Sequence, residues 1–101
     1  MKLYLLSQDV NNGYDTYDSC VVCAEDEDAA RRVHPSEYVT HNRDGKWYGT
    51  YEAGGEYETE NANGYASWVP FTKIADIKVT FLGEADESTP HGVVCSSFNA
   101  G

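Results

Sequence analysis

The sequence has few basic residues, and this scarcity argues against several classes of function. Only seven residues are Lys or Arg, against 17 Asp or Glu, so the formal net charge is −10. Proteins that bind a phosphate backbone or an anionic membrane surface need clustered Lys and Arg. We therefore expect no direct contact with nucleic acid or membrane. A protein partner should be basic or should itself bind nucleic acid.

Long apolar runs are also absent, and cysteine is scarce. Residues 1–10 carry one Lys and an apolar run too short for a signal sequence, and no stretch approaches the roughly 20 residues of a membrane span. The three cysteines cannot all pair within one chain, and in a reducing compartment they are better read as small buried side chains. These features predict a cytoplasmic protein.

Length and hydrophobic content predict a single domain over residues 1–101. Four short apolar runs are typical of strands, and they lie at Lys2–Ser7, 19–24, 77–82 and 93–98. We expect the first strand to lie centrally in a sheet, and the last two to form a hairpin.

A short helix is predicted between the second strand and Pro35. Residues 25–28 are all acidic and favour the positive end of a helix dipole, whereas Arg31 and Arg32 suit its last turn. Asp26 or Glu25 can serve as the N-cap. The expected unit is therefore a strand, a sharp turn and a helix of two turns.

Residues 36–67 differ in composition from the rest of the chain, because aliphatic side chains almost vanish while Tyr, Gly and Glu increase. We interpret this segment as an insertion outside the core, with a β-hairpin turning at Asp44-Gly45. After it, Trp68 should belong to the core, and Thr72 can cap a short turn.

The predicted fold class is thus α+β. We expect one small domain with a mostly antiparallel sheet of about four core strands, one helix packed on it, and an inserted Tyr-rich hairpin or loop.

The spacing of the residues gives little support for a catalytic site or a metal site. Cys20 and Cys23 have the CxxC spacing of redox and zinc sites, but residues three apart on a strand point to opposite faces. Whether Cys95 approaches either of them stays open. No GxSxG, phosphate-binding glycine loop or HExxH motif occurs. We expect no catalytic residue, no metal and no cofactor.

The insertion offers the best candidate binding surface, because Tyr and Trp are enriched at interfaces. Its predicted members are Tyr48, Tyr51, Glu52, Glu56, Tyr57 and Glu58, with only Lys46 nearby to oppose the acidic charge. The alternative is that the aromatic side chains merely pack the insertion onto the sheet. Both interpretations stay open at this point.

Two functions follow from these observations. The first is a non-enzymatic, acidic interaction module whose insertion binds a basic protein. The second is a small enzyme or small-molecule-binding domain, with a pocket between the helix and the insertion that uses His34, Cys23 or Tyr side chains.

Five segments carry a resemblance to known sequences: MKLYLLSQ at 1–8, YDTYDS at 14–19, VVCAEDEDAARRVHP at 21–35, VTFLGEA at 79–85 and GVVCSSFNAG at 92–101. Together they resemble a family of small uncharacterised bacterial and prophage-encoded proteins. The resemblance carries no chemistry. Its prophage association implies a phage accessory or anti-defence role, and residues 36–67 are longer than the family pattern leads us to expect.

Overall fold

The computed structural model describes residues 1–59 and 67–99. Residues 60–66 of the predicted insertion and residues 100–101 of the last resemblance segment lie outside the described residues. The elements, in chain order, are β1 (Lys2–Ser7), β2 (Thr16–Ala24), α1 (Glu27–Arg31), β3 (His41–Arg43), β4 (Lys46–Thr50), β5 (Glu56–Glu58), η1 (Phe71–Asp76), β6 (Lys78–Glu84) and β7 (Gly92–Asn99).

The larger sheet has four strands in the order β6-β1-β2-β7. β1 has the predicted bounds and lies centrally, as expected from its apolar composition. In the β1–β2 ladder Tyr4 lies opposite Val22 and Leu6 opposite Cys20, and all four are buried on one face. Leu5 and Val21 are also paired, and because side chains alternate along a strand they lie on the other face, where both are half-buried.

The prediction that the last two strands form a hairpin is wrong. β6 pairs with β1 and β7 with β2, so they occupy opposite edges of the sheet. The β1–β2 hairpin already fills the middle, and the connection from β6 to β7 passes its end, where the Ala85 N–H donates to the Met1 carbonyl.

The helix begins where the sequence indicates and ends earlier than expected. Asp26 is the N-cap, and its side chain accepts a hydrogen bond of 2.8 Å from the Ala29 N–H. α1 spans five residues rather than two full turns, because Arg32 already forms the C-cap. Ala30 is its only fully buried residue, so little apolar surface favours a longer helix.

The insertion contributes to the core, contrary to the sequence interpretation. Trp47 of β4 is 1% exposed, as is Trp68, whose burial was predicted. The indole N–H of Trp47 donates to the Val69 carbonyl at 2.9 Å, which satisfies its only polar atom. This hydrogen bond and the packing around it fasten the small sheet to the segment before η1.

Thr72 does not cap the turn that follows. Pro70 occupies the N-cap position of η1, and no side chain makes a capping bond there. Proline presets the backbone dihedral at this point without any side-chain hydrogen bond.

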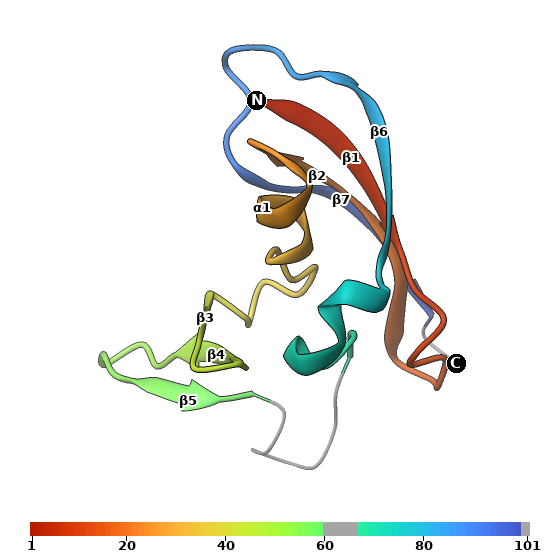
Figure 1. Ribbon diagram of the computed structural model, residues 1–101. Helices are drawn as coiled ribbons and strands as arrows, with labels where there is room; N and C mark the ends of the chain where they lie inside the picture. Colours follow the sequence, from red (N-terminus) through yellow and green to blue (C-terminus); the bar gives the residue numbers. More distant parts are fainter. Residues whose placement is uncertain (60–66, 100–101) are drawn as a thin grey trace.

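Figure 1 shows that α1, η1 and the smaller sheet all lie on the same side of the four-stranded sheet. The core fills the space between these layers. The far face of the four-stranded sheet carries no helix or strand of the described chain.

Candidate functional site

The β3–β4 hairpin turns where the sequence predicts. Asp44 and Gly45 both have positive φ, 52° and 76°, the signature of a type I′ turn. This turn fixes the register, so that His41 lies opposite Tyr48 and Arg43 opposite Lys46. Strand alternation then places these four side chains on one face of the small sheet, whereas Trp47 points from the other face into the core.

We call the first face the hairpin face; it comprises His41, Arg43, Lys46, Tyr48, Glu56 and Glu58. Tyr48 lies at its centre. The His41 ring stacks on Tyr48 with 5.7 Å between centroids and 14° between planes, and the Arg43 guanidinium lies 4.9 Å from the Tyr48 ring centroid. Tyr48 is thus held by two neighbours that are both able to carry positive charge.

Glu56 of β5 connects these two neighbours. One carboxylate oxygen lies 2.6 Å from Nε2 of His41, and the other forms an ion pair with Arg43. The Glu56 side chain is 32% exposed and that of Arg43 is 54% exposed, so the network lies at the surface. The result is an ordered polar cluster outside the core.

The structure therefore corrects the expected charge of this surface. Lys46 was the only cation expected near the acids, but Arg43 and His41 of β3 reach across β4 to Glu56 of β5. Lys46 itself pairs with Glu58 at 3.6 Å. The register could have revealed this, since residues 41, 43, 46 and 48 share a face once the turn is placed at Asp44-Gly45.

The six predicted surface residues fall into separate groups. Tyr48, Glu56 and Glu58 lie together on the hairpin face. Tyr51 follows β4 and packs against Tyr57 with 4.7 Å between ring centroids, and Glu52 is exposed beyond it. Tyr57 lies opposite Gly49 on the core-facing side, so it belongs to the packing rather than to the hairpin face.

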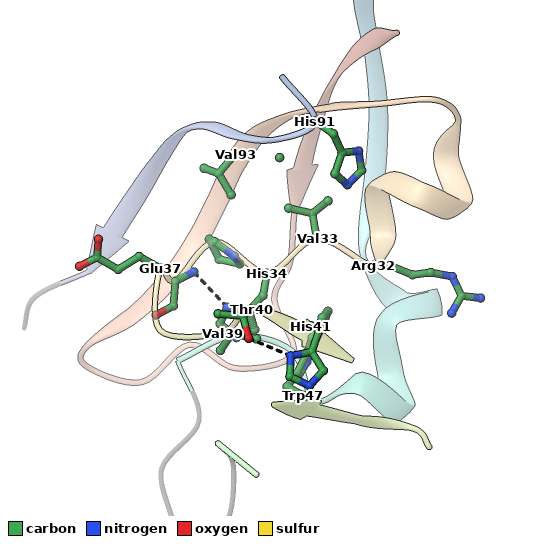
Figure 2. Close-up of a pocket in the computed structure, with 13 residues that line it drawn as sticks. Arg32, Val33, His34, Glu37, Val39, Thr40, His41, Trp47, His91 and Val93 are labelled. Carbon is green, nitrogen blue, oxygen red and sulfur yellow. Dashed lines mark hydrogen bonds between the residues drawn. The ribbon is translucent and has the colours of Figure 1, made fainter. Parts of the chain in front are cut away.

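A pocket of about 480 Å³ lies beside the hairpin face, where the second functional hypothesis expected one. It is bounded by the segment after α1, by β3 and β4, and by the start of β7. Figure 2 shows His91 and Val93 on one side of this space and His41 and Trp47 on the other. His34 also lines it, but neither Cys23 nor any Tyr of the described residues does.

Among the described side chains that line the pocket, only that of His34 has a strongly shifted pKa. Burial lowers the pKa of His34 to about 3. Its Nδ1 accepts a hydrogen bond of 3.0 Å from the Ser36 N–H, and its ring meets the edge of Trp47 at 5.0 Å between centroids. A neutral ring that accepts through Nδ1 carries its proton on Nε2. His34 is thus a neutral, packed side chain at neutral pH.

The cysteines are placed as strand side chains. Cys20 is part of the buried core, whereas Cys23 faces the opposite side and its thiol lies 3.8 Å from the Thr89 carbonyl. Burial, with a smaller contribution from nearby Cys95, raises the pKa of Cys20 to about 12. All three are free thiols, and only Cys95 is exposed.

Within residues 1–59 and 67–99, no three or more His, Cys, Asp or Glu side chains gather in a way that could hold a metal ion. The same part of the chain has no helix long and apolar enough to cross a membrane. No protein-family model, curated protein or solved structure matches the chain. The geometry of the hairpin face and of the pocket is therefore the basis for any functional assignment.

Proposed function

We propose that the protein is a non-enzymatic interaction module that binds a basic protein through the hairpin face. One observation carries the proposal: Tyr48 contacts both His41 and Arg43, and both of these are bound to Glu56, at the surface of the small sheet. The side chains of this network contact solvent rather than the core.

We expect the network to contribute little to folding, which favours a role in binding. Exposed ion pairs stabilise a fold by about 0–1 kcal/mol, because water screens them and ordering long side chains costs entropy. Side chains that are already ordered lose less entropy when a partner arrives. Tyr and Arg are also the residue types that dominate binding energy at interfaces.

Charge supports a basic partner. The net charge of −10 attracts cations over a distance and accelerates encounter, whereas the aromatic contact would govern dissociation. Because Glu56 and Glu58 are paired locally, the attraction comes from the molecule as a whole. A basic protein that itself binds nucleic acid fits this description, and so does a phage accessory or anti-defence role in the cytoplasm.

The test begins with affinity capture from a lysate of the encoding organism. Wild-type protein, Tyr48→Ala and Tyr14→Ala serve as baits; Tyr14 is 74% exposed and lies in the distant loop before β2, which makes it a matched control. A partner that is retained by wild type and Tyr14→Ala but lost from Tyr48→Ala supports the proposal. Equal capture by all three baits removes the hairpin face from the binding site.

Surface plasmon resonance measurements with the purified partner then separate the effect of charge on the on-rate from the effect of the aromatic contact on the off-rate. We expect Tyr48→Ala to raise the off-rate at least about tenfold, and the on-rate of wild type to fall as salt rises. An on-rate insensitive to salt would contradict a basic partner.

The pocket supports a second candidate, a small-molecule site or a small enzyme. The pocket has a volume of about 480 Å³, and His34, which lines it, has a shifted pKa. Both features are common in ligand sites. Val93→Trp would fill it from β7, a strand of the other sheet. A metabolite that raises the melting temperature of wild type but not of Val93→Trp would favour this candidate.

A further inference from the structure

The strand β7 forms an unpaired and uncharged edge of the four-stranded sheet. It pairs with β2 on one side only, and no strand of the described residues 1–59 and 67–99 pairs with its other side. Every residue from Val93 to Asn99 is exposed. The apolar side chains Val93, Val94 and Phe98 are 40%, 52% and 47% exposed.

The opposite edge, β6, is protected in the usual way. It begins with Lys78 and ends with Glu84, and charged residues at an edge discourage pairing with another chain. The sequence of β7, GVVCSSFN, has no charged residue and no proline. Each edge strand has an irregularity in its pairing, at Leu82 of β6 and at Val94 of β7, so the two edges differ in charge, which is one of the features that keep a protein from pairing through its edge.

The outer face of the sheet continues this uncharged surface inward from β7. Cys95 lies opposite Val21, and Val21 lies opposite Leu5, which places three uncharged side chains in a row across three strands. Leu5 and Val21 are half-buried and Cys95 is exposed. A strand added beside β7 would extend this row and cover more apolar surface.

We propose that β7 pairs antiparallel with β7 of a second copy of the chain, which joins the two sheets into one. A twofold contact requires a surface complementary to itself, and an antiparallel strand pair meets this condition because each strand offers the other the same backbone donors and acceptors.

The lack of charge on β7 favours a second copy rather than a basic partner as the occupant. Each molecule carries −10, so two copies repel at long range, and a contact between them is least opposed where neither surface is charged, as along β7. A basic protein gains no ion pair from this strand. The contact is independent of the hairpin face, which belongs to the other sheet.

Two single substitutions form a matched test. Val94 on β7 and Leu82 on β6 are 52% and 51% exposed, and each lies at an irregularity in the pairing of an edge strand. Sedimentation equilibrium of wild type, Val94→Lys and Leu82→Lys, with reductant present because Cys95 is exposed, measures the dimer constant from about 1 to 500 µM, the range for a contact smaller than a standard interface.

We expect Val94→Lys to raise the dimer Kd at least about tenfold and Leu82→Lys to change it less than about twofold. Ser97→Glu, also on β7, repeats the test with a small exposed residue, and circular dichroism verifies that each variant is folded. A monomer at every concentration, or equal loss of the dimer in Val94→Lys and Leu82→Lys, overturns the proposal.

Salt separates this contact from the proposed partner binding. Screening reduces the repulsion between two acidic molecules, so the dimer should tighten as salt rises from about 0.05 to 0.5 M, whereas binding to a basic protein should weaken. A dimer that weakens with salt would contradict an uncharged contact between copies.

Discussion

The two sheets of the molecule are stabilised by different kinds of side chain. The four-stranded sheet buries Tyr4, Leu6 and Val22 along its central strands, and each adds apolar contact across a wide face. The three-stranded sheet has one fully buried large side chain, Trp47, and its other face carries polar pairs around Tyr48. The small sheet is therefore attached to the core mainly through Trp47, and its hairpin face can serve a function other than folding.

The largest loss of stability is expected when Trp47 is removed. Trp47→Ala should lower the free energy of unfolding by about 3–5 kcal/mol, because it opens a cavity and leaves the Val69 carbonyl without its indole donor. Urea denaturation followed by circular dichroism measures the change. Trp47→Phe keeps most of the volume and should cost less, and a loss below about 1 kcal/mol for Trp47→Ala would show that the small sheet is held by other contacts.

A second test uses the histidine that packs on Trp47. The folded-state pKa of His34, about 3, lies below the ordinary histidine value of 6.5, so as pH falls below 6.5 His34 stays neutral in the folded protein while it takes up a proton in the unfolded chain. Stability is therefore fully present above pH 6.5 and declines as pH falls toward 3.

We expect wild type to lose about 2 kcal/mol between pH 7 and pH 5 from this residue. His34→Asn keeps an acceptor for the Ser36 N–H and should lose that dependence, whereas His91→Asn, at an exposed position, should retain it. Urea titrations of the three proteins at each pH measure the difference. Identical acid profiles would exclude burial of His34 as the cause.

Gly49 tests how closely the core-facing side of the small sheet is packed. A Cβ at this position would lie 2.5 Å from the Tyr38 carbonyl oxygen and from the Tyr57 ring. Gly49→Ala should therefore destabilise the protein by about 1–3 kcal/mol. Gly13→Ala is the control, because the nearest atom to its Cβ would be 4.0 Å away. Thermal melts of both variants that coincide would contradict the close packing of β4 against β5.

Glu56 should show the smallest effect on stability. Glu56→Gln removes the negative charge that binds His41 and Arg43, yet these pairs lie at the surface, and we expect a loss of less than about 1 kcal/mol. Glu52→Gln, at an exposed position beyond the network, serves as the matched control in the same urea experiment. A loss above about 2 kcal/mol from Glu56→Gln would make the network a structural element.

Local patterns in the sequence predicted local structure well. Lys2–Ser7 is the central strand because an apolar run without Gly or Pro suits a buried strand, and Asp44-Gly45 forms the turn because both residues tolerate positive φ. Asp26 caps the helix for a similarly local reason. Each of these depends on residues that are neighbours in the chain.

Long-range structure was harder to predict. The strands β6 and β7 are close in sequence, and it is the pairing of β1 with β2 between them that places them on opposite edges. Trp47 stands among polar residues, so its burial depends on Val69 and the layer that it meets, which no nearby residue indicates. For the same reason the predicted acidic surface lacked Arg43, a residue that reaches Glu56 only after β4 and β5 have paired.

The most direct test of the account measures stability and binding on one variant, Tyr48→Ala. We expect its free energy of unfolding to change by less than about 1 kcal/mol, since Tyr48 lies outside the buried core, while its affinity for the captured partner falls at least about tenfold. A loss of stability above about 2 kcal/mol together with unchanged affinity would contradict the account, because Tyr48 would then serve the fold and not a partner.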